Sequence, residues 1–426
     1  MLDKQSRIVI VGGGTFGLSA AYHLARSGYS AVTVLEKGAA IPGPQSAAND
    51  INKIVRAEYT DPFYSDLALE AISAWTADTV FAPHYHQTGY LLGVSGAAPE
   101  VGRRTLALQL ESLQSHPAWA GKIEHVRSRE DLHRVAPALD GDMPGWSGYF
   151  NSFSGYAHSA NALRAIHRTV LDLGVQVELG KDVVELIYEA IQSGQPDQSC
   201  RCVGVSTATG HRYAADVVIL TLGANVGRLL PAVGNQVVAK AWALAHVQLT
   251  PDEAKRLRGI PVTFMRDLGF FFEPEPTTGL FKVCAEGAGF SNFVPSLGLS
   301  VGASVEDSAL LPPAAEAKMR RLLAQALPTL ADRPFIDGHL CWCADTADSD
   351  YVIDTVPGTT GLVIATGDSG HGFKMLPIAG KWIQEVAEKG HQDLPRWRWK
   401  EGADARAADK HRSGEVVDIN DIKAKI

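Results

Sequence analysis

The sequence predicts an α/β fold in which a dinucleotide-binding domain is interleaved with a second domain of mixed β-sheet and helices. The chain opens with a strand, a glycine-rich turn, a helix and a second strand that ends in an acid. Similar strand-and-turn segments follow at residues 216–225 and 361–374, so we expect the chain to return to the same sheet. Between them lie short β-like runs at 242–249, 269–273 and 280–284, which predict an antiparallel sheet in the second domain.

The opening segment has the residue pattern of a phosphate-binding turn. The apolar run Ile8–Val11 predicts a buried strand before three consecutive glycines. Gly12 permits the tight turn, Gly14 lets the backbone approach a pyrophosphate, and Gly17 lets the following helix pack close to the strand. The N-terminus of that helix offers free N–H groups and a positive dipole end to phosphates. Glu36 stands about 20 residues further on, where a carboxylate accepts ribose hydroxyls, so the segment predicts binding of FAD or NAD(P).

The remaining elements are expected in a regular order. A Gly/Pro/Ser/Asn-rich loop spans residues 41–52, and residues 60–130 carry a mainly helical pattern. Further helices are expected at 160–173 and 378–389, and further strands at 175–179, 202–205 and 216–220. We therefore assign residues 1–60, 150–230 and 335–426 to the dinucleotide-binding domain, and residues 61–149 and 231–334 to the substrate-binding domain.

Composition and charge narrow the class of protein. With 426 residues, 46% hydrophobic and 20% charged, the chain is long enough for two or three domains of a soluble globular protein. Its net charge of −8, without a long basic block, argues against a nucleic-acid partner. No apolar stretch is long enough to cross a bilayer, and the first is too short and glycine-broken for a signal peptide. The 5 cysteines then indicate free thiols in a reducing compartment.

The C-terminal tripeptide Ala424-Lys425-Ile426 bears on localisation. Its small-basic-aliphatic pattern is similar to the peroxisomal address Ser-Lys-Leu but departs from it at two of the three positions. An ordinary polar tail is the other interpretation. We expect an intracellular protein, either peroxisomal or cytoplasmic.

Cys341 and Cys343 flank a tryptophan on an expected strand, where both thiols point to one face. Two thiols alone make a poor zinc site and lack metal-ligand spacing, so no metal is expected. From the local sequence alone, buried structural thiols are the favoured interpretation, because free cysteine is usually buried.

Lys282 lies within an apolar strand, where a lysine is costly unless it reaches solvent, pairs or functions. Glu286, four residues on, is its candidate partner. The charge of Lys282 therefore indicates either an ion pair or a functional site.

Arg56 and Lys374 are two further basic candidates. The planar guanidinium of Arg56 can grip a carboxylate, although from the local sequence a surface ion pair with Glu58 or Asp61 is favoured. Lys374 is expected at the carboxyl end of a parallel strand, where ligands bind in open α/β sheets. We interpret the neighbouring His371 as a capping or packing residue.

Taken together, these segments resemble one enzyme family over nearly the whole chain. They are similar to the fructosyl amino acid oxidases (amadoriases) and to monomeric sarcosine oxidase and its relatives, the FAD-dependent amine oxidases of the D-amino acid oxidase superfamily. The matching segments, specific in combination and not singly, are Gly12–Gly17, Ser46–Arg56, Gly279–Cys284, Cys341–Thr346 and Gly367–Lys374. The resemblance implies FAD as the cofactor and a Rossmann-type, D-amino acid oxidase-like domain that binds it.

The resemblance also implies roles for individual residues. Cys341 occupies the family position that forms a thioether to the flavin 8α carbon. Lys282 matches the lysine on the N5 side of the flavin that promotes reaction of reduced flavin with O₂, since a fixed cation there stabilises developing superoxide. Arg56 and Lys374 match the pair that holds the substrate carboxylate in sarcosine oxidase. Glu286 stands where sarcosine oxidase has a histidine and amadoriases have a glutamate, so it points towards the amadoriases and implies a role in substrate binding and catalysis.

By the same resemblance, the cofactor-binding residues are expected in and around the matching segments. They are Gly12, Gly14, Thr15, Phe16, Gly17, Glu36, Lys37, Ser46, Lys53, Val183, Cys341, Asp368, Gly370, Gly372, Phe373 and Lys374. Two features depart from the amadoriase pattern. The stretch Val55–Tyr64 looks more like sarcosine, pipecolate or saccharopine oxidases, and Ala347 replaces a proline common after the Cys341–Thr346 segment. Both departures favour an N-substituted α-amino acid over a fructosyl substrate.

The expected activity is oxidation of a secondary amine, such as an N-methyl α-amino acid, to an imine or iminium, with O₂ reduced to hydrogen peroxide. The imine is hydrolysed, or an internal nucleophile traps it in a new ring, which would suit an amadoriase-like enzyme of fungal secondary metabolism. The alternatives are deglycation of fructosyl amino acids, a dehydrogenase, against which Lys282 argues, and a non-catalytic flavin-binding protein. The expected partners are the small-molecule amine and O₂, without a membrane or nucleic acid, and the expected state is a monomer or weak homo-oligomer.

Overall fold

A mainly parallel β-sheet forms the centre of one part of the computed structural model, which describes residues 2–190, 198–405 and 414–425. Only the β22–β24 pair at one edge is antiparallel. Strands far apart in the sequence are therefore neighbours, as the sequence predicted. In spatial order the strands are β22 (Val352–Thr355), β24 (Leu362–Thr366), β13 (Val217–Leu220), β1 (Ile8–Val11), β2 (Val32–Glu36) and β9 (Gln176–Leu179).

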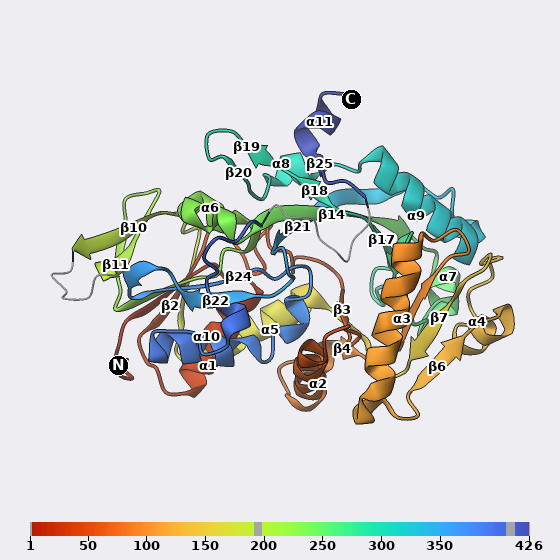
Figure 1. The fold of residues 1–426 in the computed structure, drawn as a ribbon, viewed down its shortest axis with the longest axis horizontal. Helices are drawn as coiled ribbons and strands as arrows, with labels where there is room; N and C mark the ends of the chain where they lie inside the picture. The colour runs from red at the N-terminus through yellow and green to blue at the C-terminus, as the bar shows by residue number, and fades with distance from the viewer. Residues whose placement is uncertain (1, 191–197, 406–413, 426) are drawn as a thin grey trace.

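The sequence of β1 explains its central place. Its apolar residues are buried on both faces, as is usual for parallel strands covered on both sides. Ile8 and Ile10 pack with the helices on one face, while Val9 and Val11 pack with residues of β10 and β11 on the other. The covering helices are α1 (Thr15–Arg26), α5 (Ser159–Asp172) and α10 (Ala379–Lys389), and α1 contacts both of the others (Figure 1).

A larger mixed sheet forms the second part. It contains the antiparallel strands that the sequence predicted, with β14 paired to β17 and β17 to β16. Its order is β25 (Val417–Asp418), β18 (Phe290–Ser291), β14 (Val238–Gln248), β17 (Leu280–Ala285), β16 (Gly269–Phe271), β15 (Val262–Met265), β5 (Tyr90–Val94), β7 (Ser147–Asn151) and β6 (Ile123–Val126), with β21 (Ile336–Asp345) also on β14. Helix α9 (Pro313–Ala326) packs on β16 and β17, and α3 (Glu100–Ser115) packs against β5 (Figure 1).

Smaller elements complete the fold. The short strands are β3 (Lys53–Val55), β8 (Gly155–Ala157) and β4 (Tyr85–His86) in one sheet, β10 (Val183–Ala190), β11 (Gln198–Thr207), β12 (Arg212–Ala214) and β23 (Gly358–Thr360) in another, and the pair β19 (Phe293–Val294) and β20 (Leu299–Ser300). The other helices are α2 (Pro62–Ala77), α4 (Arg129–Val135), α6 (Val226–Leu229), α7 (Pro251–Arg256), α8 (Val305–Ser308) and α11 (Ile419–Lys423).

The mainly helical expectation for residues 60–130 is wrong in part. Helices α2, α3 and α4 begin in this region, but β4, β5 and β6 interrupt them. Strand β5 is buried at every position. A short buried apolar run has no polar face to set a period, so its sequence does not distinguish a strand from a helix.

Two close contacts fix the start of α1 at the edge of the parallel sheet. Gly12 has φ +108°, which L side chains rarely adopt. A Cβ on Gly17 would lie 1.9 Å from the carbonyl oxygen of Gly12, so only glycine allows the first turn of α1 to pass this close to the loop. The N-terminus of α1 therefore lies directly beyond the carboxyl end of β1.

Two expectations from the sequence concern membrane association and cellular location. In the described part of the chain, no helix is long and apolar enough to span a membrane. Ile426, the last residue of the expected address, lies outside the described residues, so that expectation stays a prediction, as do the domain boundaries.

Candidate active site

A cavity of about 870 Å³ is lined by residues of both sheets. The structure brings together in it all the predicted site residues except Gly17, which lies beneath the glycine loop. The residues placed there are Gly12, Gly14, Thr15, Phe16, Glu36, Lys37, Ser46, Lys53, Arg56, Val183, Lys282, Glu286, Cys341, Asp368, Gly370, Gly372, Phe373 and Lys374. Their shared location is a structural finding, whereas their individual roles stay predictions.

One end of the cavity is the turn between β1 and α1. Helix α1 has Gly14 at its N-cap, no capping side chain and no acid in its first turn, so its first N–H groups remain available to an anion. The nearest atom to a Cβ on Gly14 would be 3.9 Å away, so the backbone there is open to close approach. The carboxylate of Glu36 accepts hydrogen bonds from the N–H groups of Gly13 (2.8 Å) and Gly38 (2.7 Å), which hold it at the end of β2.

The segment after β24 forms another wall. Trp75 of α2 donates to the carbonyl of Lys374 (2.7 Å), which fixes the backbone of this segment against α2. Asp368 accepts a hydrogen bond from the N–H of Ala344 (2.9 Å), and burial raises the pKa of its carboxyl to about 6. The ring of His371 bonds to Tyr351 (3.0 Å) and to the carbonyl of Ser349 (2.8 Å), contacts that suit the packing role expected for it.

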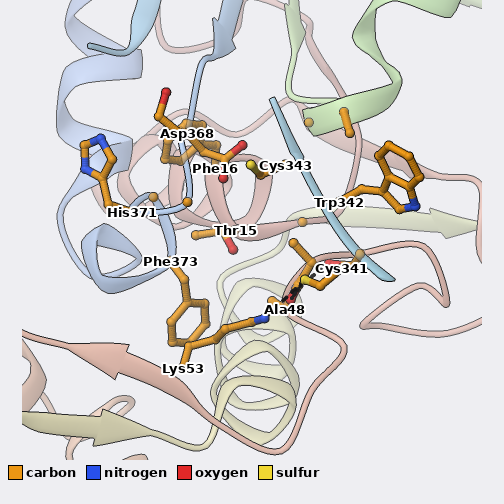
Figure 2. Close-up of a pocket in the computed structure, with 18 of the residues that line it drawn as sticks. Thr15, Phe16, Ala48, Lys53, Cys341, Trp342, Cys343, Asp368, His371 and Phe373 are labelled. Carbon is orange, nitrogen blue, oxygen red and sulfur yellow. Dashed lines mark hydrogen bonds between the residues drawn. The ribbon is translucent and has the colours of Figure 1, made fainter. Parts of the chain in front are cut away.

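Cys341 faces the cavity from β21, in register with Trp242 of β14. Its Sγ lies 3.3 Å from the Nζ of Lys53 and 3.7 Å from the carbonyl oxygen of Ala47. Figure 2 shows the side chain of Lys53 reaching toward Cys341. The thiol of Cys341 therefore lies in contact with the ammonium group of Lys53 at the wall of the cavity.

A buried carboxylate joins Lys53 to Lys282. Oδ2 of Asp50 lies 2.9 Å from Nζ of Lys53 and 2.5 Å from Nζ of Lys282, which also donates to the carbonyl of Asn52 (2.9 Å). The sequence suggested Glu286 as the partner of Lys282, and this is corrected: the ion pair is made with Asp50, a residue 232 positions away. Burial alone would raise the pKa of Asp50, but the two ammonium groups outweigh it and hold that pKa well below its usual range.

Arg56 does not form the surface ion pair favoured by its local sequence. Its guanidinium donates to the backbone carbonyl of Glu58, while Asp61 pairs with Arg396 (2.5 Å). The carboxyl of Glu58 is fully buried and accepts from Asn151 (2.7 Å), and burial raises its pKa. The guanidinium of Arg56 is therefore left directed at the cavity.

Arg56 and Lys374 meet at the ring of Tyr59. The guanidinium carbon of Arg56 lies 5.0 Å from the ring centroid and Nζ of Lys374 lies 5.2 Å from it. Lys374 is buried and donates to the hydroxyl of Tyr59 (2.9 Å). Burial, and then the charge of Arg56, lower the pKa of Lys374 well below its ordinary value.

Several residues that line or adjoin the cavity were not predicted from the sequence. Asp50 stands inside the matching segment Ser46–Arg56, and an acid three residues before a lysine was a usable signal. Tyr59, Gln109 and Arg266 gave no comparable signal, because they come from segments far apart in the chain and only the fold brings them together.

The chain is similar to known proteins over most of its length. The family described as FAD dependent oxidoreductase matches residues 7–386. The chain belongs to this family. It is 33% identical to the L-saccharopine oxidase of Schizosaccharomyces pombe over 98% of each chain, and 25% identical to a monomeric sarcosine oxidase of Bacillus sp., with 90% and 93% covered. The solved structure of the deglycating fructosamine oxidase Amadoriase II from Aspergillus fumigatus matches with a TM-score of 0.88 at 34% identity, covering 99% of this chain and 97% of that one.

These comparisons confirm the predicted family, the α/β fold class with a D-amino acid oxidase-type domain, and an FAD-dependent oxidoreductase. The residues present also fit FAD. The open backbone at Gly14 and the uncapped start of α1 suit a pyrophosphate, and the cavity continues from there to Cys341 and Lys282.

The ion triad of Asp50, Lys53 and Lys282 yields a prediction about stability. Asp50→Asn is expected to lower the free energy of unfolding by about 3–5 kcal/mol, because it leaves two buried ammonium groups without their counter-charge. Urea unfolding followed by far-UV circular dichroism measures the loss. The matched control, Asp216→Asn, breaks the partly exposed ion pair with Arg7 and should cost clearly less, because solvent screens exposed charges. Equal, small losses in both variants would contradict a stabilising role for the triad.

Proposed function

We propose that the protein oxidises the secondary amine of an N-substituted α-amino acid with O₂. The observation that carries the proposal is the convergence of Arg56 and Lys374 on Tyr59 inside the cavity. Two cations buried side by side repel each other and lose hydration, so they are costly unless an anion joins them. Lys374 donates to the hydroxyl of Tyr59 and to the carbonyl of His371 (3.4 Å), both neutral oxygens. The α-carboxylate of an amino acid is an anion of the right size and charge for this place.

The residues of the chain then position the substrate. When bound, FAD supplies the two-electron oxidation of the amine to an imine and the transfer of those electrons, with two protons, to O₂ as hydrogen peroxide. Arg56 and Lys374 fix the carboxylate, which restricts the orientation of the carbon–nitrogen bond. Glu286 lines the cavity beyond the end of β17, where we assign it a substrate contact with a catalytic role. Hydrolysis of the imine gives an amine and a carbonyl compound, and capture by an internal nucleophile would close a ring.

The charge of the ion triad supports a role in the reaction with O₂. One carboxylate lies between two ammonium groups, so the triad carries a net positive charge. A fixed positive charge in a site with little water stabilises negative charge that develops on oxygen. We assign this role to Lys282, the member of the triad on β17.

The surroundings of Cys341 support a covalent attachment of the cofactor. The thiol faces the cavity, half-buried, with the ammonium of Lys53 beside it. Cys343 is buried, and burial is the ordinary state of a structural thiol. We therefore propose Cys341 as the 8α thioether residue.

Deglycation of fructosyl amino acids is the second candidate, favoured by the similarity of the whole fold to Amadoriase II. A flavin-binding protein without turnover is the candidate from another class. A peroxisomal location is a further proposal, which rests on the C-terminal tripeptide and on the similarity, at 26% identity, to the peroxisomal sarcosine oxidase of Mus musculus.

The substrate class can be tested by anaerobic bleaching of the bound flavin. We expect N-substituted α-amino acids among sarcosine, N-methyl aromatic amino acids, pipecolate and saccharopine to bleach it, and air to restore it. Arg56→Met should weaken binding of such a substrate about 10–100-fold, the effect of losing a charged hydrogen bond. Arg256→Met, which removes an exposed arginine paired with Asp140, is the matched control. Bleaching by fructosyl-glycine alone would favour deglycation, and no bleaching at all would favour the non-catalytic protein.

The same carboxylate clamp predicts a pH dependence. The lowered pKa of Lys374 means that its ammonium loses its proton below the ordinary lysine value of 10.5. Binding of (methylthio)acetate, which has no amine to titrate, should be constant between the pH at which its acid is ionised and the lowered pKa of Lys374, and should weaken as pH rises through that pKa. Lys374→Arg should abolish the alkaline loss, because a guanidinium keeps its proton. A loss of binding at the same pH in both proteins would contradict the assignment.

If Lys282 promotes the reaction with O₂, its removal should slow reoxidation of the flavin and leave reduction of the flavin by substrate nearly unchanged. In Lys282→Met, Asp50 keeps Lys53 as its partner, so the fold should persist. Reduction of the flavin by substrate should stay within a few-fold of wild type, whereas reoxidation by O₂ should slow at least about tenfold. Stopped-flow absorbance measures both rates. Lys381→Met, which removes an exposed ammonium paired with Glu70, is the control, and reoxidation at the wild-type rate in Lys282→Met would refute the role.

The covalent link predicts a change in the extracted cofactor. Acid precipitation of wild type should leave the yellow colour in the protein pellet, whereas Cys341→Ser should release the flavin into the supernatant. Cys343→Ser is the neighbouring-thiol control and should keep the flavin bound. Colour retained in the pellet by Cys341→Ser would place the link elsewhere.

A further inference from the structure

A further basic side chain, that of Arg266, enters the cavity from the end of another strand. Arg266 follows β15 directly, and its backbone N–H donates to the carbonyl of Gly93 on the parallel neighbour β5 (2.9 Å). Its side chain lines the same cavity as Arg56 and Lys374. Because Arg266 is held by the pairing of two strands, its guanidinium starts from a fixed position on the sheet.

A hydrogen-bonded chain ties Arg266 to the carboxylate clamp. Nη1 of Arg266 donates to Oε1 of Gln109 on α3 (2.9 Å). The amide of Gln109 donates in turn to the carbonyl oxygen of Glu58 (3.3 Å), which also accepts from the guanidinium of Arg56. One side chain and one carbonyl thus set the spacing between two guanidinium groups.

The hydrogen-bond partner of Arg266, Gln109, carries no charge to neutralise the guanidinium. Gln109 is a neutral amide and occupies one of the five N–H donors that a guanidinium carries. Burial lowers the pKa of Arg266, the charge of Arg56 lowers it further, and Glu286 is the carboxylate whose charge opposes this. Three basic groups, Arg56, Lys374 and Arg266, thus face two carboxyl groups, Glu58 and Glu286, at this end of the cavity.

Two further features suit an elongated acid. Tyr90 lines the cavity, and its hydroxyl is buried and has no hydrogen-bond partner in the described part of the chain. A buried hydroxyl without a partner is costly, and a ligand oxygen would satisfy it. The rings of Phe264, Phe270 and Phe272 form a continuous row of edge contacts (5.1 and 5.8 Å between centroids) along the same cavity. Such a row offers apolar surface to the methylene groups of a substituent.

We propose that Arg266 is a second carboxylate subsite, and that the substrate is an N-(carboxyalkyl) α-amino acid with an acid group on each side of its secondary amine. This inference rests on the proposed function, which supplies the first carboxylate at Arg56 and Lys374. The acid of the N-substituent then binds Arg266, with the Tyr90 hydroxyl as an additional donor. An N-methyl group and a neutral sugar both lack the acid that this subsite would bind.

Binding to the holoenzyme tests the subsite without turnover. The probes are thioether acids, in which sulfur replaces the amine nitrogen: S-(2-carboxyethyl)thioglycolate and its amide, S-(2-carbamoylethyl)thioglycolate, together with the carboxymethyl and 3-carboxypropyl homologues. Each diacid has the shape of its amide and differs in one charge. Isothermal titration calorimetry should show that at least one diacid binds about 10–100-fold more tightly than its amide, as a charged hydrogen bond provides.

Two variants test whether Arg266 causes the tighter binding of the diacid. Arg266→Met should reduce the affinity for the diacid to that for the amide and leave the affinity for the amide within about threefold of wild type. Arg256→Met, on the exposed surface, should keep the full preference. The inference is overturned if no diacid is preferred by wild type, or if the preference survives in Arg266→Met. Failure of every probe to bind, the monoacid amides included, would instead overturn the carboxylate clamp at Arg56 and Lys374 and the proposed function with it.

Discussion

The ion triad centred on Asp50 is the interaction on which the arrangement of the cavity depends. Its three charges come from the loop after β2, from β3 and from β17, so it joins the segment beside the glycine turn to the second sheet. A buried carboxylate is stable only while an ammonium group stays beside it, since each ion has given up its hydration. The same contacts set Lys53 beside Cys341. One electrostatic constraint therefore positions a thiol, a lysine and the junction of the two sheets.

Beyond the triad, the distribution of charge divides the cavity into two ends with different chemistry. At the glycine turn, backbone N–H groups and the acid Glu36 face the space where α1 begins. At the other end, guanidinium and ammonium groups predominate over carboxylates among the described side chains. Dipoles and hydrogen bonds suit a large cofactor that must be held along its length, whereas excess fixed charge suits a small anion that must bind and leave.

The sequence was sufficient where a function depends on consecutive residues. Gly12, Gly14 and Gly17 act within one turn, so their spacing, together with the strand before them and the helix after them, predicted the β1–α1 unit. The partner of Lys282 could not be predicted in this way, because Asp50 lies 232 residues away and becomes a neighbour only when β17 closes on the loop. Gln109 and Arg266, 157 residues apart, are a similar case. Strand β5 was missed because it is buried on every side, which removes the alternation that identifies a strand.

The attachment of Arg266 to a strand, and not to a loop, has a mechanical consequence. Met265 stands opposite Gly93 in the register of β15 and β5, and Arg266 continues that register through its backbone hydrogen bond. A slip of one residue would turn the side chain to the opposite face of the sheet. The carboxylate subsite proposed at Arg266 therefore takes its position from strand register. Moving that position along the sheet requires an insertion, a deletion or a bulge in β15 or β5.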